Sequence, residues 1–193
     1  MSQEVVNVVL AGLGGQGVIK ASDILADVVF RAGLDVKKAE VHGMSQRGGS
    51  VRTDVRFGLN VYSPMVPDGS AHFLLVFTAD QVENNRYVLA PSGVLISPAD
   101  IALEQLTNRK CANVALLGVL SRHLAFSEPL WREALAANLH EHLLPANLQA
   151  FAAVRDSPAV TRASPPASAA GFSEPPPPVP GAQPGCQTVR RRT

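Results

Sequence analysis

Hydrophobic and polar positions along the chain follow two different periods. Residues 5–10 read VVNVVL, β-branched and apolar on both faces, which is typical of a central strand covered on both sides. Apolar residues then recur at steps of three and four over 18–32, which predicts a helix that buries one face. Gly33 is placed to end this helix in a left-handed conformation, and residues 34–42 begin a second strand. The pattern predicts a strand–helix–strand unit.

Residues 51–58 are also predicted to form a strand, but one with a charged face. Apolar or small residues alternate there with Arg52, Asp54 and Arg56, the period of two that a strand shows. We expect this strand at the edge of the sheet or against another surface, because water does not reach the charges of a central strand.

The remaining segments alternate between strands and helices. Strands are predicted at 72–77 and 93–98, and helices at 78–90, 112–124, 127–143 and 146–154, with Thr78 and Ser127 as N-terminal caps and Trp131 as a core anchor. Apolar strands that alternate with helices predict an α/β fold. We expect a Rossmann-like three-layer sandwich with a mostly parallel sheet.

Composition divides the chain into residues 1–155 and 156–193. The second part holds nine of the fifteen prolines and one aromatic residue, so it buries too little apolar surface to fold, and we expect a disordered proline-rich tail. The tail carries four arginines and two acids, which leaves the first part 13 basic residues of the 17 and 14 acidic residues of the 16. That balance disfavours nucleic acid as a partner of the folded part.

Cysteine usage and the absence of apolar runs exclude several further classes. Cys111 and Cys186 cannot supply the four thiolates of an iron–sulfur cluster or a structural zinc site, so any metal chemistry requires another chain. The longest dense apolar run is 73–77, and no basic segment with an apolar stretch begins the chain. We expect no signal peptide, no membrane span and a cytoplasmic protein.

The spacing Gly12-x-Gly14-x-x-Gly17 follows the first predicted strand and opens the first helix. It fits a dinucleotide-binding turn, in which a phosphate lies over the helix N-terminus, but also a turn that only lets strand and helix pack closely. The acidic residue that would hold the ribose is not well placed, because Asp35 begins the second strand and Glu40 lies far along it. Spacing alone leaves both interpretations open.

Other polar candidates are isolated. His42 and Arg47 would hold an anionic or carbonyl ligand or, as their positions favour, pack at an interface. His140 and His142 are two apart on a predicted helix, so they point to different sides and we expect surface histidines. No Ser/His/Asp or Cys/His constellation can be assembled, so the chain by itself shows no catalytic machinery.

Several stretches together resemble a known family. They are GLGGQGVIKASDILA (12–26), AGLDVKKAEVHGMSQRGGSVRTDVRFG (32–58), NVALLGVL (113–120) and NLQAFAA (147–153). Over roughly residues 5–155 the chain resembles the gamma-type domain of 2-oxoacid:ferredoxin oxidoreductases, and most of all the small β subunit of indolepyruvate ferredoxin oxidoreductases. The proline-rich tail has no counterpart in this pattern, and Thr78-Ala79-Asp80 stands where the family tends to have a glutamate.

The resemblance implies a non-catalytic small subunit of an enzyme that oxidatively decarboxylates arylpyruvates to arylacetyl-CoA. A large partner subunit would carry thiamine diphosphate, Mg²⁺ and [4Fe-4S] clusters, coenzyme A would be the co-substrate, and ferredoxin would accept the electrons. This chain alone is expected to bind none of the cofactors and to be inactive. Alternatives are the gamma subunit of a pyruvate or other 2-oxoacid ferredoxin oxidoreductase, or a free-standing dinucleotide-binding or interaction module.

The candidate site consists of two segments, 12–17 and 42–49. We expect both to lie at the contact with the large subunit, near the active centre of the complex. Their backbone amides and Arg47 would steady a phosphate or carboxylate of cofactor, coenzyme A or substrate, while Arg52 and Arg56 are assigned to the interface. The candidate residues are Gly12, Gly14, Gly15, Gln16, Gly17, His42, Ser45, Gln46, Arg47, Gly48 and Gly49.

Overall fold

A computed structural model describes residues 5–42, 48–101, 106 and 108–156. The strands of its sheet are β1 (Val6–Leu13), β2 (Asp35–His42), β3 (Ser50–Gly58), β4 (Ala71–Val76) and β5 (Leu89–Ile96). The α-helices are α1 (Val18–Arg31), α2 (Asp80–Asn85), α3 (Ala112–Ser121), α4 (Glu128–Asn138) and α5 (Leu144–Arg155). Short 3₁₀ turns lie at η1 (Arg86–Val88), η2 (Pro98–Asp100), η4 (Arg109–Cys111) and η5 (Glu141–Leu143). The proposed tail, 156–193, lies outside the described residues from 157 onward.

The five strands form one mixed sheet in the order β2-β3-β1-β4-β5. The α/β prediction is confirmed, but the mostly parallel sheet is wrong: β3 runs antiparallel to both β1 and β2, and only the pairs β1–β4 and β4–β5 are parallel. The connection from β2 to β3 is too short for a helical crossover, which needs a dozen residues or more, so β3 returns beside β2.

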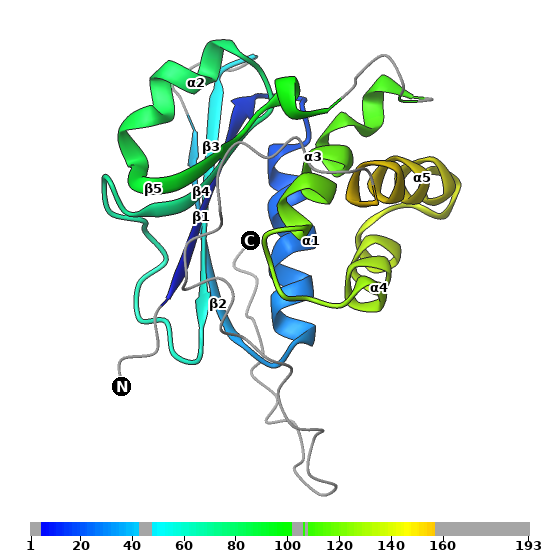
Figure 1. Cartoon of the computed structure of the whole chain (residues 1–193), viewed down its shortest axis with the longest axis horizontal. Helices are drawn as coiled ribbons and strands as arrows, with labels where there is room; N and C mark the ends of the chain where they lie inside the picture. The colour runs from blue at the N-terminus through cyan, green and yellow to red at the C-terminus, as the bar shows by residue number, and fades with distance from the viewer. Residues whose placement is uncertain (1–4, 43–47, 102–105, 107, 157–193) are drawn as a thin grey trace, which may run out of the picture.

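Helices cover the two faces of the sheet unequally (Figure 1). α1, α3, α4 and α5 bury the large core on one face, where Leu10, Phe57 and Phe73 are almost inaccessible. The other face carries a smaller core around Val9 and Leu74, under α2 and the connection between β3 and β4. One face therefore contributes most of the apolar burial that stabilises the domain.

Two positions were expected for the charged strand, the edge of the sheet or a place against another surface. The edge is wrong, because β3 lies between β2 and β1, and its charged face instead meets the β3–β4 connection. Its charges have partners inside the chain. Arg52 makes a two-pronged contact with Asp54, 2.8 Å at its closer oxygen, and the Asp54 side chain is fully buried. Arg56 donates to the carbonyl oxygens of Ser63 and Met65 at 3.0 and 3.1 Å. The bonds from Arg56 hold the β3–β4 connection over the charged face of β3. The charged groups therefore have hydrogen-bond partners within the chain and do not need to be exposed to water.

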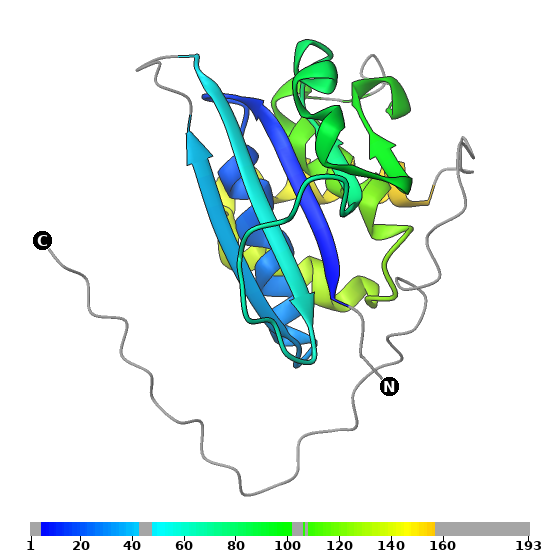
Figure 2. The same ribbon diagram turned by 90° about the vertical axis from the view of Figure 1, so that its left-hand side faces the viewer.

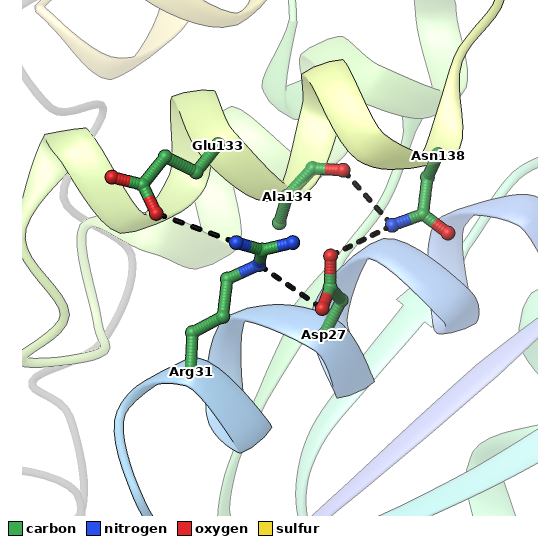
Figure 3. Close-up of polar contacts among 5 residues, drawn as sticks. All are labelled: Asp27, Arg31, Glu133, Ala134 and Asn138. Atoms are coloured by element: carbon green, nitrogen blue, oxygen red, sulfur yellow. Dashed lines mark hydrogen bonds and ion pairs between the residues drawn. The ribbon is translucent and has the colours of Figure 1, made fainter.

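A group of polar contacts joins α1 to α4 at the surface of the helical layer (Figure 3). Asp27 accepts a hydrogen bond from Asn138 at 3.0 Å and forms an ion pair with Arg31 at 3.1 Å. Arg31 also forms an ion pair with Glu133 of α4 at 3.4 Å. Trp131 of α4 confirms its predicted role as a core anchor, since it is fully buried. These polar contacts hold α4 against α1, and the Trp131 indole contributes the buried apolar surface.

Three predicted helices end earlier than expected. The helix at 112–124 stops at Ser121. The helix at 78–90 stops at Asn85, because η1 and then β5 take the residues that follow, and its N-cap is Ala79 rather than Thr78. The helix at 127–143 begins after Ser127 as predicted but ends at Asn138, where the backbone becomes extended. Gly33 ends α1 as expected, with φ of 77°. No described helix is long and apolar enough to cross a membrane.

Candidate functional site

The glycine turn and the described ends of the second candidate segment lie at the same end of the sheet. Gly12, at the end of β1, lies opposite Val51 of β3, and Val51 lies opposite His42 at the end of β2. The amide of Gly14 donates to the carbonyl oxygen of Gly49 at 2.9 Å. The glycine turn and the end of the 42–49 loop are therefore neighbours, at the carboxyl ends of the parallel strands where α/β proteins bind ligands.

The glycines of the turn serve different purposes. A Cβ on Gly12 would lie 2.8 Å from both Gln16 Oε1 and Val18 Cγ2, so close packing excludes a side chain there. Gly15 and Gly17 have φ of 91° and 79°, in the left-handed region that favours glycine. Space around Gly15 is open, whereas the side chain of Asn113 lies against Gly17. Packing and backbone geometry thus account for three of these glycines without a ligand.

Gln16 is engaged within the turn itself. Its Oε1 accepts a hydrogen bond from the backbone amide of Leu13 at 2.8 Å, and its backbone amide donates to the Leu13 carbonyl oxygen at 3.1 Å. A side chain in this position closes the turn and has less freedom to contact a ligand.

The N-terminus of α1 lies at this end of the sheet. Its N-cap is Gly17, which makes no side-chain capping bond, and no acidic residue lies in its first turn. Lys20 is the charged residue of that turn and is exposed. Such a terminus favours an anion, because unpaired amides and the helix dipole both attract negative charge.

Two residues that sequence reasoning missed lie beside the turn. Asn113, near the start of α3, contacts Gly17. Gln81 of α2 is buried, and its Oε1 accepts a hydrogen bond from Ser50 Oγ at 2.5 Å. Asn113 opens one of the stretches that carried the family resemblance, which was the available signal, whereas nothing in the local pattern distinguished Gln81.

The remaining candidates fall partly outside the described residues. Ser45, Gln46 and Arg47 lie in the segment 43–47 that the structure does not describe, and only the backbone of His42 is described. Gly48 is in the left-handed region with φ of 65°. The interface assigned to Arg52 and Arg56 stays a prediction, since their described contacts lie within the chain.

A dinucleotide would lack its usual ribose partner at this end of the sheet. Asp35 is at the start of β2 and accepts the Val61 amide at 2.8 Å, which together with the bond from Lys37 lowers the pKa of Asp35. Glu40 pairs with Lys38 at 2.8 Å. The residue that ends β2 is His42, so no carboxylate stands where a ribose would be held.

The described residues do not fit a metal or an iron–sulfur cluster. None of the groups of His, Cys, Asp and Glu among residues 5–42, 48–101, 106 and 108–156 could hold a metal ion with three ligands. Cys111 is buried, which raises the pKa of its thiol, and the whole chain has two cysteines where a cluster takes four.

The histidine pair differs from its prediction. His140 and His142 do not lie on one helix, because α4 ends at Asn138 and η5 begins at Glu141. Their rings stack with centroids 5.9 Å apart and planes at 19°, instead of pointing to different sides. Both residues are exposed, as expected of surface histidines.

Sequence comparisons identify the family of the chain. The family model for pyruvate ferredoxin/flavodoxin oxidoreductase matches residues 7–157. The indolepyruvate oxidoreductase subunit IorB of Methanothermobacter thermautotrophicus is 30% identical over 186 residues, an alignment that covers 75% of this chain and 93% of that protein. IorB of Thermococcus kodakarensis is 50% identical over 82 residues, 42% of this chain and 40% of the length of that relative.

Solved structures show the same fold at low sequence identity. The gamma subunit of a keto/oxoacid ferredoxin oxidoreductase from Geobacter sulfurreducens has a TM-score of 0.66 at 19% identity, over 79% of this chain and 95% of that one. A 2-oxoglutarate:ferredoxin oxidoreductase from Magnetococcus marinus, solved with 2-oxoglutarate, coenzyme A and succinyl-CoA, has a TM-score of 0.71 at 22% identity. The match covers 85% of this chain but 33% of the Magnetococcus chain. With the family model spanning most of its length, the chain belongs to the pyruvate ferredoxin/flavodoxin oxidoreductase family, as a gamma-type domain.

Proposed function

We propose that this chain is the small, non-catalytic subunit of a cytoplasmic indolepyruvate ferredoxin oxidoreductase. The observation that carries the proposal is the alignment with the Methanothermobacter IorB subunit, which runs along 93% of that protein. In this proposal residues 1–155 are the folded domain and 156–193 a proline-rich tail. The reaction is the oxidative decarboxylation of arylpyruvates to arylacetyl-CoA, with ferredoxin as electron acceptor.

The chemistry itself belongs to the large partner. Thiamine diphosphate, when bound there with Mg²⁺, supplies the carbanion chemistry, and [4Fe-4S] clusters carry the electrons. The present chain contributes the backbone amides of the α1 N-terminus, which the contact between Gly14 and Gly49 holds beside the second candidate segment. Its role is to place these donors and Arg47 against an anionic group of coenzyme A or substrate.

The first experiment measures turnover of the large subunit with and without this chain. We expect indolepyruvate-dependent reduction of ferredoxin only when both are present, with pyruvate and 2-oxoglutarate as the comparison substrates. A 44% identity over 50 residues to the 2-oxoglutarate synthase subunit KorC of Archaeoglobus fulgidus makes 2-oxoglutarate the relevant competitor. Preference for pyruvate or 2-oxoglutarate would contradict the indolepyruvate assignment while leaving the subunit role intact.

A second experiment tests whether Arg47 holds an anionic group. Arg47→Ala should lower turnover of the assembled enzyme about 10²-fold, the scale on which one donor to a developing or bound anion acts. Arg132→Ala, on the exposed side of α4, is the matched control and should leave turnover unchanged. Unchanged turnover in the Arg47 variant, with assembly intact, would remove the anion-holding role.

A further inference from the structure

β2 is an outer strand of the sheet, and no described strand pairs with its free side (Figure 2). Alternate backbone N–H and C=O groups of such a strand point away from its neighbour β3. Val41 on β2 leaves 43% of its surface exposed. β2 is therefore a regular eight-residue template to which a further strand can add.

The charges along β2 balance one another. Lysine on an edge strand normally opposes pairing with another chain. Here Lys37 pairs with Asp35 at 2.9 Å, and Lys38 pairs with Asp23 of α1 at 2.5 Å and with Glu40 at 2.8 Å. With two lysines and two acids, the strand presents no net charge to a partner.

We propose that β2 pairs antiparallel with β2 of a second copy of this chain, around a twofold axis at Ala39. A twofold axis perpendicular to the sheet keeps every side chain on its own face. Side chains alternate between faces, so residues directly opposite one another must both have even numbers or both have odd numbers. This condition restricts the registers to those with one residue facing its own copy on the axis.

Charge then selects one register. An axis at Lys37, Lys38 or Glu40 would set identical charges directly opposite each other, which is destabilising. An axis at Ala39 sets two small side chains opposite each other and places Lys38 opposite Glu40 of the second copy, twice. It also lays the aliphatic stem of Lys37 against Val41 of the second copy. Of these central registers, the one at Ala39 makes the strand complementary to itself.

The pairing joins two five-stranded sheets side by side and leaves the glycine turns accessible. The turns lie at the ends of the strands, whereas the proposed contact lies along the side of the sheet. The inference therefore does not depend on the proposed enzymatic function.

The first test is a disulfide across the axis. Opposite residues of an antiparallel pair have Cα atoms about 4.5–5.5 Å apart, within disulfide range. In a Cys186→Ser background, Ala39→Cys should give a disulfide-linked dimer on mild oxidation. Lys37→Cys is the matched control: two such residues would be about 13 Å apart along the strands, at about 3.3 Å per residue, and should stay unlinked. Equal linking of both variants, or of neither, would overturn the register.

The second test exchanges the charges. Sedimentation equilibrium of the full chain should show a reversible dimer, and Glu40→Lys alone or Lys38→Glu alone should each weaken it roughly tenfold. Mixing the two variants should restore association, because positions 38 and 40 are then both positive in one strand and both negative in the other. A monomeric parent chain, or a mixture no tighter than either variant alone, would overturn the proposal. If β2 pairs only with a different protein, the proposed pairing with a second copy of this chain is wrong.

Discussion

Gly12 and Gly14 lie two residues apart but have different neighbours. A side chain at Gly12 meets Gln16, Val18 and Phe77 at 3.1 Å or less, whereas one at Gly14 would find its nearest atom 3.6 Å away, an ordinary contact. The spacing of the motif could be read from the sequence, but this difference could not. It depends on where Phe77 of the neighbouring chain segment and the Gln16 side chain come to lie.

Substitution of these glycines should therefore have unequal effects. We expect Gly12→Ala to lower the free energy of unfolding by about 1–3 kcal/mol, as overpacking does in a tight site. Gly14→Ala should change it by less than about 0.5 kcal/mol. Urea unfolding of both variants provides the measurement, and equal stabilities would show that packing does not determine the turn.

His123 should make stability depend on pH. Burial, and then the charge of Arg122, lower the pKa of His123 below its ordinary value of 6.5. The unfolded chain then binds more protons than the folded one between the two pKa values, so stability rises with pH through that window and is lost on acidification below 6.5.

The measurement is urea unfolding between pH 5 and pH 8. His123→Gln should flatten the dependence, whereas His140→Gln, at an exposed position, should keep it. An unaltered profile in the His123 variant would assign the pH dependence to other groups.

Among the elements, the strand–helix–strand unit at 5–42 was predictable and the placement of β3 was not. Apolar periodicity and Gly33 fixed the first unit, because they are local signals. The charges of β3 suggested an edge, since nothing local indicated that residues 59–70 would cover them. Helix 78–90 was overestimated for a similar reason: Leu89 pairs with Ala71 of β4, and tertiary pairing overrides the helical pattern.

The contact between Arg52 and Asp54 should matter more than exposed ion pairs. The Asp54 side chain is fully buried and that of Arg52 is 13% exposed. Burial disfavours the charge of Arg52, but the hydrogen bonds and charges of Asp54 and Tyr87 together outweigh this and raise the pKa of Arg52. Asp54→Ala leaves the Arg52 guanidinium without a carboxylate and the Val66 amide without its acceptor, and should cost about 3 kcal/mol of stability.

Glu128→Ala is the control for this prediction. It removes an exposed pair with Arg132 on one helix and should cost less than about 0.5 kcal/mol. Thermal or urea unfolding compares the two, and similar losses would mean that the buried pair contributes no more than a surface one.

At the scale of the whole molecule, the sequence led to the family but not to the full site. Strand order brings the glycine turn close to His42 and Gly49, the described ends of the second candidate segment. Asn113 and Gln81 join them through packing across the sheet and helices, which local patterns do not encode. The proposed function makes this end of the sheet the contact with a larger subunit, while the side of β2 is proposed to meet a second copy.

The most direct measurement of this account is gentle affinity purification of the tagged chain, without oxygen, from the cells that produce it. The purified material is analysed for partner proteins, thiamine diphosphate and iron. The account predicts a large subunit that arrives together with both cofactors. A chain that purifies alone, without thiamine diphosphate or iron, would contradict its role as a subunit of a 2-oxoacid ferredoxin oxidoreductase.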